Sequence, residues 1–306
     1  MDKDVTLVEV GPRDGFQPIG PLIPPEDKIA FIARLYEAGL RRMEVTAFVS
    51  ERSVPQLADA AQILKAAQAL PELSAQVLVP NQRYCDQAIE AGATEIAFVL
   101  SVSEKHNMNN VRRTPQESVA EYARLIAELP AGVGVRLNVA TAFDCPFDGQ
   151  VSPDNVIALL DPLVAVRGDV EIALCDTTGR TTPDRVKALF DRAATEFPGG
   201  ARWAFHGHDT YGLGVANVLA AYAAQVRVFD SSFGGLGGCP FAPGATGNVA
   251  TEDVVWTLAA MGIATGVDLD ALVDVADDAT RIPGALPGGR VRTALLSRRC
   301  AQALDA

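Results

Sequence analysis

Short apolar runs alternate with longer amphipathic runs about eight times along the chain. The short runs are rich in β-branched residues and predict strands over 6–11, 41–48, 75–80, 95–101, 133–141, 170–177, 201–208 and 227–233. In the longer runs, apolar residues recur every three or four positions. They predict helices over 25–38, 55–70, 83–91, 115–129, 153–166, 182–196, 212–224 and 248–261, with two more over 269–278 and 291–304. Near-continuous apolar strands are typical of a parallel sheet that helices cover.

Eight strand–helix repeats predict an α/β fold of the (β/α)8 or TIM-barrel type, which needs ~250 residues. We expect the barrel over about 5–262 and a short C-terminal helical extension over 263–306. A doubly wound sheet is the rival fold, but it would place GxGxxG after the first strand, and this chain reads GPRDGFQP there. Because no linker, repeat or low-complexity segment divides the chain, we expect a single domain.

Polar residues gather where the predicted strands end. Catalytic side chains of a TIM barrel lie at the carboxyl ends of the strands, so all of these residues would face one mouth. Barrel closure makes the first, seventh and eighth strands neighbours. The residues in question are Arg13, Asp14 and Gln17 after the first strand, Glu44 on the second, Asp176 and Thr177 after the sixth, His206 and His208 at the seventh, and Asn248 after the eighth.

The segment HGHDTYG (206–212) holds two of the three histidines of the chain. On a strand, residues two apart point to the same side, so His206 and His208 would present their imidazoles together, with Asp209 as an adjacent carboxylate. Joined by Asp14 and the amide oxygen of Asn248, they suit a divalent cofactor ion such as Mg²⁺ or Mn²⁺ with positions open for substrate. The alternatives are solvated loop histidines, a turn residue at 14 and a helix N-cap at 248.

Acidic residues and one cysteine complete the candidate site. Glu44 lies in an apolar strand, and its structural alternative is a charge paired with a neighbouring arginine, which is compatible with function. Glu9 and Glu252 are expected to hold Arg13 in place. Cys239 lies in a loop with six glycines between 234 and 247. A loop of this composition can close over a site, so the thiol is either a general acid or nucleophile, or a small apolar filler.

Composition and charge exclude several classes of function. A net charge of −12 argues against a nucleic-acid or anionic-membrane partner. The five cysteines are odd in number and form no CxxC pair, which is typical of the reducing cytoplasm, where we expect the protein to reside. No apolar run reaches ~18 residues, and the chain enters a strand directly, so we expect no membrane span and no targeting peptide.

Five segments resemble the 3-hydroxy-3-methylglutaryl-CoA (HMG-CoA) lyase family: EVGPRDGFQ (9–17), FVSERSVPQLAD (48–59), HGHDTYG, DSSFGGLGGCPFAPGATGNVATEDV (230–254) and GIATGVDL (262–269). The likeness runs from about residue 5 to 270. It implies that Asp14, His206, His208 and Asn248 bind the metal ion. Arg13 would neutralise an enolate oxygen, Cys239 would be the catalytic cysteine, and Glu44 and Asp176 would be acidic residues of the active site.

The chain departs from the family pattern along the predicted pocket wall. Asn138 stands where tyrosine is usual, and Ala140 where serine is usual. Near residue 103, His106 takes an aromatic position, while Asn110 is retained. The basic residues of this segment, Lys105, Arg112 and Arg113, would bind the phosphates of the CoA thioester. We therefore expect Gln17, Asn138, Thr177, Asn110, Arg112 and Arg113 to bind substrate.

The resemblance implies cleavage of HMG-CoA to acetoacetate and acetyl-CoA, a step of leucine degradation and ketone-body formation. Asp14, His206 or Asp176 would take the hydroxyl proton. Four alternatives remain: a lyase on a longer glutaryl or a methylmalyl- or citramalyl-type thioester, a Claisen-type synthase, a ferrous oxygenase site, and a metal-binding protein without activity. A homo-oligomer, most simply a dimer, is also expected.

Overall fold

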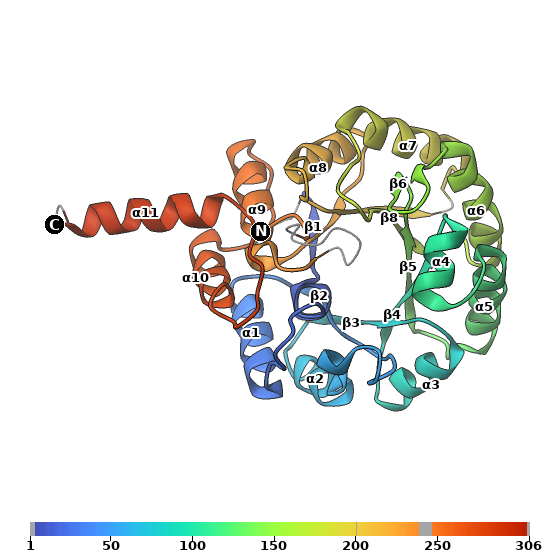
Figure 1. The fold of residues 1–306 in the computed structure, drawn as a ribbon, viewed down its shortest axis with the longest axis horizontal. Helices are drawn as coiled ribbons and strands as arrows, with labels where there is room; N and C mark the ends of the chain where they lie inside the picture. The colour runs from blue at the N-terminus through green and yellow to red at the C-terminus, as the bar shows by residue number, and fades with distance from the viewer. Residues whose placement is uncertain (1–3, 200, 239–246, 305–306) are drawn as a thin grey trace.

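Eight parallel strands form the centre of the computed structural model, which describes residues 4–199, 201–238 and 247–304. They are β1 (Thr6–Glu9), β2 (Arg42–Ala47), β3 (Ser74–Val79), β4 (Glu95–Ser101), β5 (Gly134–Ala140), β8 (Glu171–Asp176), β9 (Arg202–Gly207) and β10 (Val228–Ser231). β1 pairs with both β2 and β10, so the sheet closes into a barrel in the order β1-β10-β9-β8-β5-β4-β3-β2. Figure 1 looks along this barrel.

Eight helices form a ring around the barrel (Figure 1). They are α1 (Pro25–Glu37), α2 (Ala60–Gln68), α3 (Gln82–Glu90), α5 (Pro115–Glu128), α6 (Pro153–Val166), α7 (Pro183–Glu196), α8 (Gly214–Ala223) and α9 (Thr251–Ala260). Local signals fix several of their starts: Thr114 and Glu117 form a capping box on α5, and the Asn81 side chain accepts a hydrogen bond at the start of α3. The TIM-barrel prediction is therefore confirmed.

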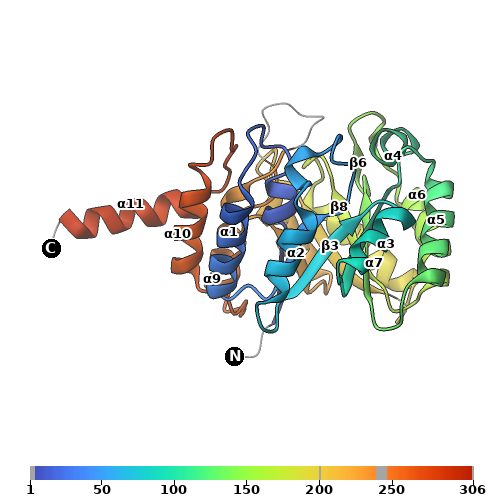
Figure 2. The same ribbon diagram turned by 90° about the horizontal axis from the view of Figure 1, so that it is seen from below.

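The structure differs from the predicted elements mainly around the mouth. After β1 the chain turns through a short π-helix, η1 (Gly11–Gly15), and the predicted helix over 55–70 divides into a 3₁₀ turn, η2 (Pro55–Leu57), and α2. An unpredicted helix, α4 (Glu104–Val111), begins where Ser103 caps the His106 amide. A small hairpin, β6 (Asp144–Cys145) and β7 (Gly149–Gln150), lies near α4 on the same rim (Figure 2). The last barrel strand leads into a second 3₁₀ turn, η3 (Phe233–Gly235).

The C-terminal extension lies beside the barrel. α10 (Leu269–Ala279) contacts α1 and α9, whereas α11 (Val291–Leu304) projects away from the body (Figures 1 and 2). Arg299 of α11 pairs with Asp270 and Asp274 of α10. Among the described residues, no helix is long and apolar enough to cross a membrane.

The two faces of the barrel strands carry different chemistry. Large apolar side chains such as Leu137, Phe205 and Phe229 face the helices and belong to the main core. The interior instead holds small residues and buried charges. Arg136, only 2% exposed, donates from Nη2 to both carboxylate oxygens of Asp230 at 2.7 Å, and its Nη1 lies 3.2 Å from Glu171. Ion pairs therefore replace the branched apolar layers that usually fill a TIM barrel.

We predict that Glu171→Ala destabilises the protein strongly. Glu171 also accepts two hydrogen bonds from Arg42 at 2.8 Å, so its removal leaves two guanidinium groups short of a partner. Breaking a buried ion pair costs about 3–5 kcal/mol of unfolding free energy, measurable by urea denaturation. Asp169→Ala is the matched control, because that carboxylate is 77% exposed beside Arg167 and its loss should cost under about 0.5 kcal/mol. Equal losses of unfolding free energy in the two variants would contradict the prediction that the interior ion pairs stabilise the fold.

Candidate active site

A cavity of about 480 Å³ opens at the carboxyl ends of the barrel strands. Its wall comes from η1, from the ends of β5, β8 and β9, and from α4. Ten of the residues that the sequence predicted for the site line it: Arg13, Asp14, Gln17, Asn110, Arg112, Arg113, Asn138, Thr177, His206 and His208. The structure thus brings together residues that lie up to 195 positions apart in the chain, from Arg13 to His208.

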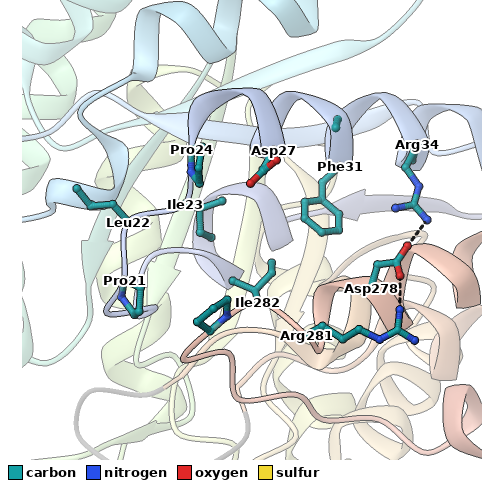
Figure 3. Close-up of a pocket in the computed structure, with 12 residues that line it drawn as sticks. Pro21, Leu22, Ile23, Pro24, Asp27, Phe31, Arg34, Asp278, Arg281 and Ile282 are labelled. Carbon is teal, nitrogen blue, oxygen red and sulfur yellow. Dashed lines mark hydrogen bonds and ion pairs between the residues drawn. The ribbon is translucent and has the colours of Figure 1, made fainter.

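A second hollow, of about 520 Å³, lies outside the barrel between the start of α1 and the segment after α10 (Figure 3). Phe31, Ile23 and Ile282 give it an apolar wall. Three of its charged side chains are paired with one another, because Asp278 contacts Arg34 at 2.8 Å and Arg281 at 2.6 Å. The titratable and metal-ligating groups converge on the barrel mouth, which is therefore the candidate active site.

The metal-ligand prediction rests on three side chains at that mouth. Asp14 on η1, His206 on β9 and His208 just after it each offer one ligand atom, and these atoms lie within 4.8 Å of one another. β1 and β9 both pair with β10, which brings η1 beside the two histidines. The ring centroids of His206 and His208 are 5.2 Å apart. The expected convergence of Asp14 and the HxH pair is confirmed.

Asn248 completes this group without being a helix cap, since α9 begins at Thr251. Its Nδ2 donates to Asp14 Oδ2 at 2.7 Å and to the Leu236 carbonyl at 3.1 Å. Within the described residues, the buried Asn248 Oδ1 and His208 Nδ1 have no hydrogen-bond partner. A buried polar atom without a partner is costly. A carboxylate, two imidazoles and an amide oxygen in one place are a donor set that fits a divalent cation.

The protonation states of Asp14 and His208 suit a cation, whereas at His206 burial is outweighed by the Asp230 carboxylate, which raises the pKa of the ring. Burial opposes ionisation of Asp14, yet Arg13 and the two histidines lower its pKa to about 2. Burial, with the neighbouring His206, lowers the pKa of His208 to about 4, so its ring is neutral at pH 7. Metal ligation requires a deprotonated carboxylate and a neutral imidazole.

Arg13 is held over the mouth by Glu44. The Arg13 side chain donates from Nε to Glu44 Oε1, and Gln76 Nε2 donates to Glu44 Oε2 at 2.8 Å. Arg13 Nη1 also contacts Asp14 Oδ1 at 2.6 Å and Gln17 Oε1 at 3.4 Å. The arginine pairing considered for Glu44 is confirmed, and the pair fixes the Arg13 guanidinium beside the Asp14 carboxylate.

The prediction that Glu9 and Glu252 hold Arg13 in place was wrong, because both carboxylates bind the backbone instead. Glu9 accepts hydrogen bonds from the Gly11 and Phe233 amides, and from the Thr251 hydroxyl at 2.7 Å. Glu252 accepts one from the Gly234 amide at 3.1 Å. Burial raises the pKa of Glu9 to about 8 and that of Glu252 to about 7. Glu9 therefore ties together the elements that follow β1 and β10.

Two further carboxylates lie off the cavity. Cys175 and Thr177 line it, and Asp176, between them on the chain, points to the other side of β8. The amide of Thr181 donates to Asp176, and burial raises the pKa of this carboxyl group to about 6. The catalytic role expected of Asp176 stays a prediction. Asp209 adds no carboxylate to the metal group, because it accepts from the Gly214 amide at 2.7 Å and so supports the start of α8.

The wall opposite the metal group carries the predicted CoA contacts. Arg112 ends α4 in the left-handed conformation (φ 59°), and Arg113 donates to the Pro80 carbonyl at 2.6 Å. Lys105 instead pairs with Asp148 at 2.5 Å. Asn138 Oδ1 accepts from Arg136 Nε at 3.0 Å, so its amide NH₂ is the group left to face the cavity. Cys239 lies outside the described residues.

Sequence reasoning missed Asp230 and Arg136, which lie below the mouth. Asp230 Oδ2 is 3.1 Å from His206 Nδ1. The signal was present, because each is a charged residue inside an otherwise apolar strand run, as Glu44 is. A search for site residues that considers only the ends of strands overlooks charged residues in the middle of strands.

We predict that Glu252→Gln flattens the pH dependence of stability. Because the pKa of Glu252 is raised from 4.5 to about 7, the folded state binds its proton more tightly than the unfolded chain does. The unfolding free energy should therefore fall as the pH rises from 4.5 to 7, by about 3 kcal/mol from this group. Urea denaturation at pH 5 and pH 8 should show a smaller fall in the variant than in the parent. The control is Glu128→Gln, on the exposed face of α5, whose unfolding free energy should fall between pH 5 and pH 8 as much as that of the parent. If the unfolding free energy of Glu252→Gln fell as much as that of the parent, the raised pKa would not belong to Glu252.

Comparison with known proteins agrees with this geometry. Residues 4–279 match the model of the HMGL-like family. The chain is 41% identical over 278 residues to the cytoplasmic 3-hydroxy-3-methylglutaryl-CoA lyase of Rattus norvegicus, covering 90% of this chain and 80% of the relative. The crystal structure of hydroxymethylglutaryl-CoA lyase from Pseudomonas aeruginosa superposes with a TM-score of 0.91 at 38% identity, covering 97% and 99% of the two chains.

A third protein was solved with ligands. The HMG-CoA lyase of Acinetobacter baumannii, in complex with coenzyme A and 3-methylmalate, superposes with a TM-score of 0.88 at 36% identity, covering 95% of this chain and 94% of that one. The family match spans most of the chain, and the fold and the converging side chains agree with it. The chain therefore belongs to the HMGL-like family, and these three relatives from rat, Pseudomonas and Acinetobacter are HMG-CoA lyases.

Proposed function

We propose that this protein is a divalent-metal-dependent C–C lyase that cleaves HMG-CoA to acetoacetate and acetyl-CoA. The observation that carries the proposal is the convergence of Asp14, His206 and His208 within 4.8 Å, directly beside Arg13, in a member of the HMGL-like family. A cytoplasmic location agrees with the four described cysteines, all of which are free thiols.

Asp14, His206, His208 and Asn248 would hold the ion, and Mg²⁺ or Mn²⁺ suits a donor set that is half oxygen. When bound, a divalent ion supplies Lewis acidity to the substrate hydroxyl and lowers the pKa of its proton. The buried Asn248 and His208 atoms without partners support this assignment.

The residues of the chain then remove one proton from the substrate hydroxyl and deliver one proton to the enolate carbon. Asp14 is the most direct candidate to take the hydroxyl proton, because His206 contacts Asp230 through Nδ1 and would hold the ion through Nε2. Asp176 is less direct, since it points away from the cavity. As the hydroxyl oxygen becomes a ketone, the electron pair of the adjacent C–C bond passes to the thioester, which leaves as an enolate. Arg13, fixed by Glu44, places positive charge beside the developing enolate oxygen. Cys239 then protonates the enolate carbon to give acetyl-CoA.

The CoA moiety would lie along α4. Arg112, Arg113 and Asn110 line the outer part of the cavity, and a cationic patch is needed there because the protein is acidic overall while CoA carries phosphates. The acyl group would extend past Asn138 and Thr177 toward Gln17 and the ion.

A related branched 3-hydroxyacyl-CoA is the second candidate substrate. One observation favours it: Asn138 occupies a position where tyrosine is usual, and its NH₂ group rather than a phenol faces the acyl end. A panel of glutaryl-, methylmalyl- and citramalyl-type thioesters separates the candidates, since only the preferred acyl group should give the highest kcat/KM. An assembly of two copies remains part of the proposal and is tested by sedimentation.

We predict that the purified protein, given Mg²⁺ or Mn²⁺, converts HMG-CoA to acetoacetate and acetyl-CoA, and that His208→Ala abolishes this. Losing one of four ligands should cost far more than the ~10–100-fold typical of residues that merely support a ligand. Product formation and bound metal should be measured together. Asp209→Asn is the matched control, because its side chain supports α8, and it should keep turnover within about twofold. Metal content and turnover that are unchanged in His208→Ala would exclude the site.

We predict that Cys239→Ser lowers kcat by at least ~100-fold, the range for removing a general acid. A thiol has an unperturbed pKa of ~8.5, close to working pH, whereas a serine hydroxyl donates its proton far less readily. Mn²⁺ affinity should stay at the parent value. The matched control is Cys300→Ser, since Cys300 is exposed on α11, the helix that projects away from the barrel (Figure 1). Parental turnover in Cys239→Ser would assign the cysteine to loop packing alone.

A further inference from the structure

The two histidines of the metal group are held in different ways. His206 Nδ1 lies 3.1 Å from Asp230 Oδ2, whereas the buried His208 Nδ1 has no hydrogen-bond partner within the described residues. An ionised carboxylate can only accept, so the contact requires that Nδ1 of His206 carry the proton. The lone pair of the neutral ring is then on Nε2, the nitrogen left to point toward Asp14 and His208.

Asp230 is itself fixed from the opposite side. It is 3% exposed, in the middle of β10, and its register neighbour on β9 is His206. Both of its oxygens accept hydrogen bonds from Arg136 Nη2 at 2.7 Å. A carboxylate that accepts from a buried guanidinium is kept ionised and cannot rotate without losing two charge-assisted hydrogen bonds.

Arg136 is in turn held by contacts that leave it little freedom. Its Nε donates to Asn138 Oδ1 at 3.0 Å, and its Nη1 lies 3.2 Å from Glu171, which two hydrogen bonds join to Arg42. The planar guanidinium therefore connects the cavity wall, the metal ligand and the base of the barrel. Lysine could not reproduce this arrangement, because its ammonium group lacks the planar fork.

We propose that Asp230, held by Arg136, is a positioning residue that sets the tautomer and the ring orientation of His206, so that Nε2 faces the metal ion. The proposal rests on the metal site assigned under the proposed function. Partners of this kind at metal-binding histidines typically contribute 10–100-fold to metal affinity. Asp230 touches neither ion nor substrate and acts only through His206.

The test compares Asp230→Asn with the parent and with Asp209→Asn, the same substitution one residue beyond His208. Mn²⁺ affinity of the metal-free proteins is measured by electron paramagnetic resonance. We expect the dissociation constant to rise about 10–100-fold in Asp230→Asn and to stay within twofold in Asp209→Asn. A dissociation constant within twofold of the parent in Asp230→Asn would overturn the proposal.

A second measurement needs no variant and so does not depend on Asp230→Asn folding. The chain has only three histidines, so two-bond ¹H–¹⁵N spectra of the Mg²⁺-loaded parent, labelled on histidine, report each tautomer. We expect His206 to carry a proton on Nδ1 that exchanges slowly with water. A His206 proton on Nε2 would refute the proposal. A parent that binds Mn²⁺ but cleaves no HMG-CoA would instead refute the proposed function and leave this inference standing.

Discussion

The ion pairs inside the barrel determine how the rest of the molecule is arranged. Arg136 is almost completely buried, and burying its charge would cost several kcal/mol of folding free energy without Asp230 and Glu171 beside it. Along the axis, four carboxylates (Asp14, Glu44, Glu171 and Asp230) face three guanidinium groups (Arg13, Arg42 and Arg136), a difference of one negative charge. If both histidines are neutral, as metal ligation requires, these groups carry one net negative charge, and a divalent cation at the mouth would make their total charge positive.

The mouth depends on one further constraint, which is the close approach of η1 to η3. At Gly11 a Cβ atom would lie 2.4 Å from the Phe233 ring, so only glycine allows the turn that carries Arg13 and Asp14. Glu9 joins the same two turns to Thr251 through three hydrogen bonds. The segments that present Asp14 and Asn248, and that flank the loop containing Cys239, are thus anchored at one buried carboxylate.

The sequence was sufficient for the barrel and for the metal group because both leave periodic signals. Alternating apolar runs gave eight strands, and the i, i+2 spacing gave the orientation of His206 and His208. The sequence was not sufficient for α4, whose polar residues carry no clear apolar face, or for η1, where the amides of Gly15 and Phe16 donate to carbonyls five residues earlier. The sequence also did not predict which groups pair with a buried charge. Glu9 and Glu252 were expected to pair with Arg13, but their hydrogen bonds go to backbone amides and depend on how the segments after β1 and β10 pack.

Reaction type and substrate choice reside in separable parts of the structure. The groups proposed to act on the hydroxyl and the enolate, Asp14, His206 and Arg13, have buried partners, so changing them should cost stability as well as activity. The wall proposed to meet the acyl group and CoA includes α4 and Asn138. Asn138 is the exception that links the two parts, because Arg136 fixes the direction of its amide. Replacing it therefore alters the cavity wall and also removes one contact from the guanidinium that holds Asp230, so the wall and the proposed metal site are coupled through that single hydrogen bond.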